Sequence, residues 1–366
     1  MGPEAGVIVV RLIKATALGS AVGLLVASLL AFAPASAETL PSDGTPQPPT
    51  ESAKTPVTVV VPVRTISTPG TSGQSGIVDM RVGSSAPISV MLDTGSVGLR
   101  LWSGARPGMT MTTKKVTSAT GRENVPGLLG SAPMSIGGVS TTLDVPLQLI
   151  NTTNPYINGW KARGISGILG IGVGDGDLTN PLVALPGDLG LRWSVHFTRN
   201  TADTSGREGA LILGAKPPGN ADMHFRLPYL GVNVNGARLW NDHAADGCWT
   251  FRSSRQARKS REYCVPTWFD SGFTVMRIKG RIFSSLPRAT GKQLRSGTRV
   301  GLAAGSSAFT GDTFTAGKRA SRNLARVAPQ GKATINTGNS FYFEYTVTYN
   351  VSTGDLYLSK PPRKRK

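Results

Sequence analysis

Two stretches far apart in the chain end in the same way, with an apolar run followed by Asp, a hydroxylated residue and Gly. The first runs from Ile88 to Ser96, and the second from Val265 to Gly272. Gly at the third position lets the backbone bend where a Cβ would clash. Hydroxyl groups such as those of Thr94 and Ser96 can hydrogen-bond the carboxylate or the amides of the turn. An apolar strand ending in a hydrogen-bonded Asp suits a carboxylate that takes part in chemistry.

The two acidic residues, Asp93 and Asp270, are therefore candidates for one shared catalytic site. Two carboxylates about 3 Å apart cannot both ionise cheaply, so they hold one proton between them. One then acts as a base and the other as an acid, which is what attack of water on an amide carbonyl requires. The residues expected to support the pair share the two turns, and they are Thr94, Gly95, Ser96, Ser271 and Gly272.

Together the two motifs resemble the pepsin-like aspartic peptidases, with this chain as a divergent member of bacterial type. The resemblance covers roughly Thr58 to Leu358. Within it, Gly164 to Gly172 resembles the strand that passes beside the first Asp turn, and Ile335 to Asn350 the corresponding C-terminal run. The resemblance implies an all-β, bilobal fold of two pseudo-symmetric, barrel-like lobes. It also implies an aspartic endopeptidase that binds a protein or peptide substrate in the cleft between the lobes.

Three places depart from the family pattern. One is Asn336-Thr337, which replaces the family's usual apolar pair, so that the second supporting strand is more polar than expected. Phe273 stands where the second Asp turn usually carries Ser or Thr, which would remove a hydrogen bond that lowers the pKa of the carboxyl group. No Tyr occurs near Ala119 to Gly121, where the tip of the family's flap is expected, although Tyr156 or Trp160 could supply an aromatic ring from another loop. The alternative hypothesis is therefore a catalytically impaired pepsin-fold protein that acts as an extracellular binding module.

Short runs of Val, Ile and Thr between Gly, Pro, Ser and Asn favour an all-β chain. A first strand is expected over 57–63, and a hairpin from strands 77–82 and 86–92. Strands are also expected over 193–197 and 209–214, and one longer helix over 182–192. Trp102, six residues after the first turn, is expected to pack in the core.

The chain has 366 residues, enough for two lobes with a sizeable core. Residues 1–37 read as a signal peptide that ends in Ala35-Ser36-Ala37, with an uncleaved membrane anchor as the alternative. Residues 38–56 are rich in Pro, Ser and Thr and form a spacer or a short pro-segment. We expect an N-terminal lobe at 57–215, a C-terminal lobe at 216–360 and a basic tail at 361–366. The protein is expected to be secreted or held at the cell surface.

Cys248 and Cys264 are the two cysteines of the chain. In an exported protein an isolated pair is typical of one disulfide. The segment between them is basic and polar, which predicts an exposed loop pinned at its base.

The formal net charge is +19, and 17% of the residues are charged. The basic residues are scattered, so we expect no nucleic-acid partner, whereas an anionic polymer of the cell envelope is a candidate partner. Three histidines, His196, His224 and His243, lack the spacing of metal ligands, and no Gly-rich phosphate loop is present, so neither a metal nor a cofactor is expected. The protein is expected to be a monomer.

Overall fold

The computed structural model describes residues 58–71, 73–102, 104, 106–120, 123–151, 154–199, 209–253, 261–289, 292–305, 313–317 and 325–360. The expected signal peptide, the spacer and the basic tail lie outside these ranges. Every described residue belongs to one compact unit, Ala53–Lys366. Across the described ranges, no helix has both the length and the apolarity needed to cross a membrane.

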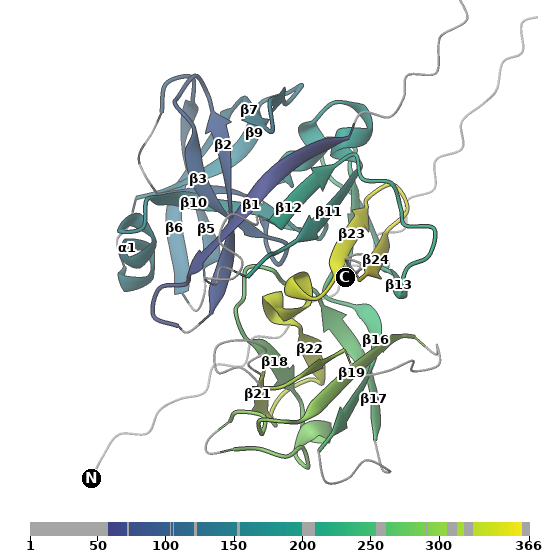
Figure 1. Ribbon diagram of the computed structural model, residues 1–366. Helices are drawn as coiled ribbons and strands as arrows, with labels where there is room; N and C mark the ends of the chain where they lie inside the picture. The colour runs from purple at the N-terminus through teal and green to yellow at the C-terminus, as the bar shows by residue number, and fades with distance from the viewer. Residues whose placement is uncertain are drawn as a thin grey trace, which may run out of the picture. The chain divides into compact units, whose positions relative to one another are not determined.

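Most of the described chain is β-strand, as the sequence predicts (Figure 1). The larger sheet has 15 described strands, in the order β13-β24-β23-β11-β12-β1-β2-β3-β10-β4-β9-β6-β5, with β7 and β8 joined to it through β2. Its strands are β1 Val59–Ser67, β2 Gln74–Val82, β3 Ile88–Asp93, β4 Val97–Leu101, β5 Thr110–Thr120, β6 Glu123–Ala132, β7 Met134–Ile136, β8 Val139–Ser140, β9 Val145–Ile150, β10 Ile165–Ile171, β11 Arg192–His196, β12 Gly209–Leu213, β13 Met223–Arg226, β23 Thr346–Asn350 and β24 Asp355–Ser359.

A second sheet of seven described strands carries the second Asp motif, in the order β20-β19-β16-β17-β22-β18-β21. Its strands are β16 Ala245–Arg252, β17 Glu262–Trp268, β18 Met276–Lys279, β19 Arg299–Ala304, β20 Phe314–Thr315, β21 Ala325–Ala328 and β22 Thr334–Asn336. A separate hairpin is formed by β14 Tyr229–Val232 and β15 Arg238–Trp240. The last two strands, β23 and β24, return to the larger sheet, where β23 pairs with β11.

The two sheets place their Asp motifs in the same local arrangement. In the larger sheet, β10 runs parallel to β3 and antiparallel to β4, and Gly170 is in register with Asp93. In the smaller sheet, β22 runs parallel to β17 and antiparallel to β18. Each Asp therefore lies at or just after the end of a strand that is flanked by a second, parallel strand from much later in the chain. Most β10 side chains are buried, which explains its almost unbroken apolar sequence.

The helical elements are short, and one prediction about them was wrong. In place of a helix over 182–192 there are two 3-10 turns, η1 Pro181–Ala184 and η2 Gly187–Gly190. Pro186 lies between them and holds Leu185 in an extended conformation, with ψ of 151°. The other 3-10 turns among the described residues are η4 Arg281–Phe283 and η5 Gly338–Phe343.

Within the described ranges there is one α-helix, α1 Pro155–Lys161, which was not predicted. Its start follows ordinary capping chemistry, because Asn154 Oδ1 accepts the N–H of Ile157 at 2.8 Å and Pro occupies the first helical position. The helix buries Ile157 and Trp160 in a small apolar cluster with Trp102, Met91 and other residues. Trp102 is 2% exposed, so its prediction as a core residue is confirmed.

Candidate active site

Asp93 is the last residue of β3, and its carboxylate is held by its own turn. Oδ1 accepts the N–H of Gly95 at 2.8 Å, and Oδ2 accepts the hydroxyl of Ser96 at 2.7 Å. We call residues Asp93 to Ser96 the first Asp loop. Both oxygens thus have a fixed donor from within three residues, which orients the carboxyl group and stabilises its ionised form.

Asp270 follows β17 by two residues and is 6% exposed. Its Oδ1 accepts the N–H of Gly272 at 3.0 Å, as in the first Asp loop. Its Oδ2 instead accepts the side-chain amide of Asn336 at 2.6 Å. We call residues Asp270 to Phe273 the second Asp loop. Asn336 was not predicted as a site residue, and it supplies the donor that Phe273 lacks.

The two Asp loops are joined by reciprocal hydrogen bonds. The N–H of Thr94 donates to Ser271 Oγ and the N–H of Ser271 donates to Thr94 Oγ1, both at 2.9 Å. The hydroxyls then donate onward, Thr94 to the carbonyl of Phe269 and Ser271 to the carbonyl of Leu92, both at 3.0 Å. Thr94 is 1% exposed and Ser271 is fully buried. Buried amides and hydroxyls are costly to leave unpaired. A shift of either loop would leave polar groups of the other loop without a hydrogen-bond partner.

The glycines show how closely each loop approaches the opposite carboxyl group. A Cβ placed on Gly95 would lie 2.3 Å from Asp270 Cγ, and one placed on Gly272 would lie 2.3 Å from Asp93 Cγ. Real Cβ atoms do not approach other atoms this closely. Only glycine therefore fits at either position, and the two predicted catalytic residues are brought together with all five predicted supporting residues around them.

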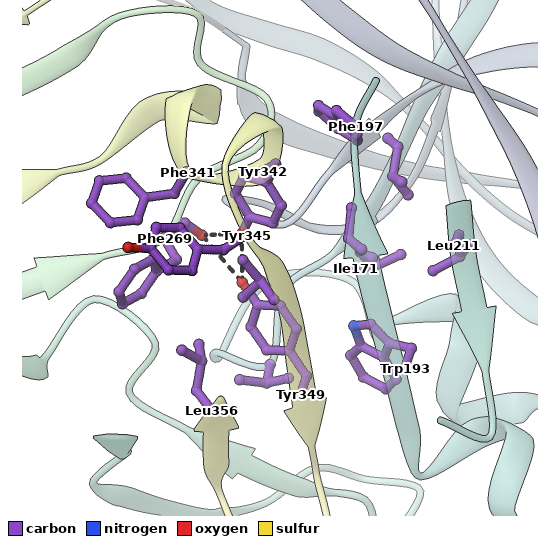
Figure 2. Packing of buried hydrophobic residues seen from close by; sticks show 14 of the residues in the cluster. Ile171, Trp193, Phe197, Leu211, Phe269, Phe341, Tyr342, Tyr345, Tyr349 and Leu356 are labelled. Atoms are coloured by element: carbon purple, nitrogen blue, oxygen red, sulfur yellow. Dashed lines mark hydrogen bonds between the residues drawn. The ribbon is translucent and has the colours of Figure 1, made fainter. Parts of the chain in front are cut away.

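Two buried tyrosines extend the hydrogen bonds of the first Asp loop. The hydroxyl of Tyr342, from η5, lies 2.6 Å from Thr94 Oγ1 and 2.7 Å from the hydroxyl of Tyr349, from β23. The Tyr342 hydroxyl also lies 3.1 Å from the carbonyl of Phe269. Figure 2 shows the two tyrosines beside Phe269, within the apolar cluster that contains Trp193. The Thr94 hydroxyl is thus linked through Tyr342 to Tyr349 of β23, in the larger sheet.

The surroundings make the two carboxyl groups unequal. Burial and the charge of Asp93 raise the pKa of Asp270 to about 7, against the lowering effect of the Asn336 hydrogen bond. Burial also raises the pKa of Asp93, but the Ser96 hydroxyl, the Gly95 amide and the positive charge of Arg100 oppose that rise. Arg100, on β4, is 7% exposed and was not predicted as part of the site. The pair therefore holds one proton up to about neutral pH, and the charge of Arg100 and the Ser96 hydroxyl favour the ionised form of Asp93.

The aromatic residues considered for the role of the flap tyrosine differ in position. Trp160 is fully buried in the apolar cluster under α1, so it is not placed to close over a substrate. Tyr156 packs edge-on against Trp160 with ring centroids 6.0 Å apart. Burial and the charges of Asp93 and Asp270 raise the pKa of Tyr156 to about 12, so its hydroxyl lies within electrostatic range of the pair. The hairpin β5–β6 is present, and the two residues at its tip lie outside the described ranges.

The sulfur atoms of Cys248 and Cys264 lie 1.97 Å apart, at disulfide distance. The two residues are directly opposite each other on β16 and β17. The bond therefore closes a hairpin whose second strand leads to Asp270, as the sequence indicates. The basic residues at the tip of this hairpin lie outside the described ranges.

Comparison with solved structures supports the fold. The chain is similar to an aspartic proteinase from Irpex lacteus, with a TM-score of 0.53 and 18% identity, over 83% of this chain and 97% of the other. The expected bilobal pepsin-like fold is thereby confirmed. No family model matches the sequence, and no curated protein matches it. The boundary between the lobes at residues 215 and 216 stays a prediction.

Proposed function

We propose that this chain is an aspartic endopeptidase that hydrolyses peptide bonds through a water molecule activated by Asp93 and Asp270. The observation that carries the proposal is the meeting of the two Asp loops, in which each glycine lies against the opposite carboxyl group and each amide bonds the opposite hydroxyl. This arrangement holds two acidic groups close together in a largely buried setting, where one shared proton is the favoured state.

The unequal surroundings assign a role to each acid. Asp93 is the ionised member, and it takes a proton from the water as the water oxygen attacks the scissile carbonyl carbon. Asp270 is the protonated member, and it donates its proton to the carbonyl oxygen, which gives a neutral tetrahedral diol. When this intermediate collapses, a diol hydroxyl returns its proton to Asp270. Asp93 passes the proton that it holds to the leaving nitrogen, and both acids regain their starting states.

The roles of the two acids give a pH window for activity. Cleavage needs an ionised Asp93 and a protonated Asp270, so kcat/KM falls as the pH rises through the pKa of Asp270, about 7. The enzyme is therefore expected to work from acidic to near-neutral pH. From the sequence we further propose that it is exported and binds a protein or peptide substrate, with an anionic envelope polymer as a candidate partner.

A broad peptide library tests the proposal when it is incubated with the protein at pH values from 3 to 8. We expect cleavage that is inhibited by a statine-type mimic of the tetrahedral intermediate. Asp93→Asn should reduce the rate by more than about a thousandfold. Asp79→Asn is the matched control, because that carboxylate is exposed on β2 and its substitution should leave the rate unchanged. A library left intact at every pH would reject the proposal and favour a pepsin-fold binding module.

A further inference from the structure

We propose that Asn336 is the positioning residue for Asp270, and that its amide does in the second Asp loop what the Ser96 hydroxyl does in the first. The inference rests on the proposed function, because it concerns the acid that would donate the proton. Asn336 lies 66 positions after Asp270 in the chain and reaches it through the pairing of β22 with β17. Nothing in the second Asp motif itself indicates this partner.

The orientation of the Asn336 amide is fixed at both ends. Nδ2 donates to Asp270 Oδ2 at 2.6 Å, while Oδ1 accepts the N–H of Gly338 at 2.8 Å. The backbone N–H of Gly338 can only donate, so it must face the oxygen of the amide and leave the nitrogen toward the carboxylate. The strand fixes the side chain as well, because Asn336 lies between Trp268 of β17 and Arg277 of β18.

The strand beside the first Asp loop shows which residue occupies the position that corresponds to Asn336. Met91 is two residues before Asp93 and pairs with Ile168, just as Trp268 is two residues before Asp270 and pairs with Asn336. Ile168 is thus the counterpart of Asn336, and it is a buried apolar residue. In the first loop, therefore, the flanking strand supplies packing and the loop supplies the donor. In the second loop the flanking strand supplies the donor.

Phe273 explains why the donor comes from elsewhere. It occupies the position of Ser96, three residues after the Asp, and its side chain has no group that can donate. Its ring instead packs under the guanidinium of Arg277, 3.9 Å from the ring centroid. An amide that only donates through nitrogen stabilises the carboxylate form of Asp270, and this opposes the effects of burial and of Asp93 on the pKa of Asp270.

The other titratable groups around Asp270 do not supply this stabilisation. Asp93 raises its pKa, and Tyr156, Tyr342 and Tyr349 are within electrostatic range of it. Burial raises the pKa of all three tyrosines, so they are neutral where the enzyme would work. Arg277 packs on Phe273, and Arg100 acts on Asp93. The side-chain hydrogen bond from Asn336 is thus the contact whose removal tests the inference.

The test uses Asn336→Leu, which keeps the shape of the side chain and removes the donor. We expect the high-pH limb of the kcat/KM profile to move to higher pH by about one unit, because a hydrogen bond to a charged group is lost. Adding Phe273→Ser restores a hydroxyl at the position equivalent to Ser96 and should return most of the shift. Asn339→Ala is the matched control, since its amide donates to the carbonyl of Gln74 and its loss should leave the limb in place.

A second readout does not need activity. In the wild-type protein Tm should fall as the pH rises toward 7, and in the Asn336→Leu variant this fall should continue for about one further unit. If wild type cleaves nothing, the proposed function fails while this measurement still tests Asn336. If the variant does not fold, Asn336→Ala serves in both measurements and should give a smaller shift in the same direction. Unchanged profiles in a folded variant, with only a uniform loss of rate or Tm, would overturn the inference and leave Asn336 a structural residue.

Discussion

The two Asp loops share the contacts that join them to each other, and they differ in the side chain that donates to Oδ2 of each Asp. The glycines of the two loops match, as do the Oδ1 atoms that accept a glycine N–H and the reciprocal bonds between Thr94 and Ser271. The Oδ2 atoms differ, because that of Asp93 accepts from Ser96 and that of Asp270 from Asn336. The shared contacts bring the two acids together. Burial raises the pKa of both, and the different donors, Ser96 and Asn336, oppose that rise. The contacts between the loops are thus symmetric, and the side-chain donors to Oδ2 are not.

The largest effect is expected where the loops are most alike. Gly95→Ala and Gly272→Ala each place a methyl group 2.3 Å from the opposite carboxyl carbon. Each should destabilise the protein by about 1–3 kcal/mol or more and reduce cleavage at least about a hundredfold. Urea denaturation and peptide hydrolysis measure the two effects. Gly219→Ala is the control, because nothing lies within 4 Å of its Cβ position. Full activity in either variant would show that the two carboxyl groups do not meet in solution.

The next largest effect is the loss of stability on removing the hydroxyl of Thr94 or of Ser271, and we expect the two losses to differ. Thr94→Val removes a group that bonds Ser271, Phe269 and Tyr342, and Ser271→Ala removes one that bonds Thr94 and Leu92. Each loss strands buried polar groups at about 1–3 kcal/mol, and the Thr94 variant should lie at the upper end. Chemical denaturation of the two single variants and the double variant gives their coupling. Equal losses of unfolding free energy in the two single variants would mean that the bond to Tyr342 adds no stability to the first Asp loop.

The third prediction concerns the pH dependence of stability. The pKa of Asp270 is about 7 in the folded protein and 3.8 as its ordinary value, so the folded state keeps a proton that the unfolded state releases. The stability that Asp270 contributes should therefore be fullest below about pH 4 and decline as the pH rises to about 7. In Asp270→Asn the decline between pH 4 and 7 should be shallower, as measured by Tm in a series of buffers. A slope identical to that of wild type would place the pKa of Asp270 near its ordinary value.

The smallest effect is expected at the far end of the hydroxyl chain. Tyr349→Phe removes one hydroxyl and leaves the hydrogen bond between Tyr342 and Thr94 in place. The cost should be about 0.5–1.5 kcal/mol, and cleavage should be nearly unchanged. Thermal unfolding and a kinetic assay at one pH suffice to measure it. A loss as large as that of Thr94→Val would mean that the tyrosine pair, rather than the reciprocal bonds, holds the first loop.

The sequence revealed the parts of this site that are local. Each turn needs Asp, a hydroxylated residue and Gly within four positions, so Asp93, Asp270 and their neighbours could be recognised in the sequence. The short apolar runs also predicted the strands. Asn336 could not be found in this way, because its role depends on the register of β22 against β17, which only the folded sheet defines. The polar pair Asn336 and Thr337, where the family resemblance implies an apolar pair, was the one available hint.

The errors in the helices have local causes. The stretch 182–192 has apolar residues at helical spacing, but Pro186 prevents a helix from passing through it. For α1, the pair Asn154-Pro155 is a recognisable helix start that was not used. The buried contribution of Arg100 was missed for another reason, since its effect on Asp93 is electrostatic and requires knowing that β4 is covered on both sides.

The return of β23 to the larger sheet has a consequence for biosynthesis. A nascent chain that has grown just past Gly272 already contains both acids and both glycines. It still lacks Asn336, Tyr342 and Tyr349, and it lacks the strand that pairs with β11. Residues 334–350 supply these supports, and they are translated after both Asp motifs. A product released soon after Gly272 would carry both Asp motifs without these supports, and under the proposed function we expect it to be inactive.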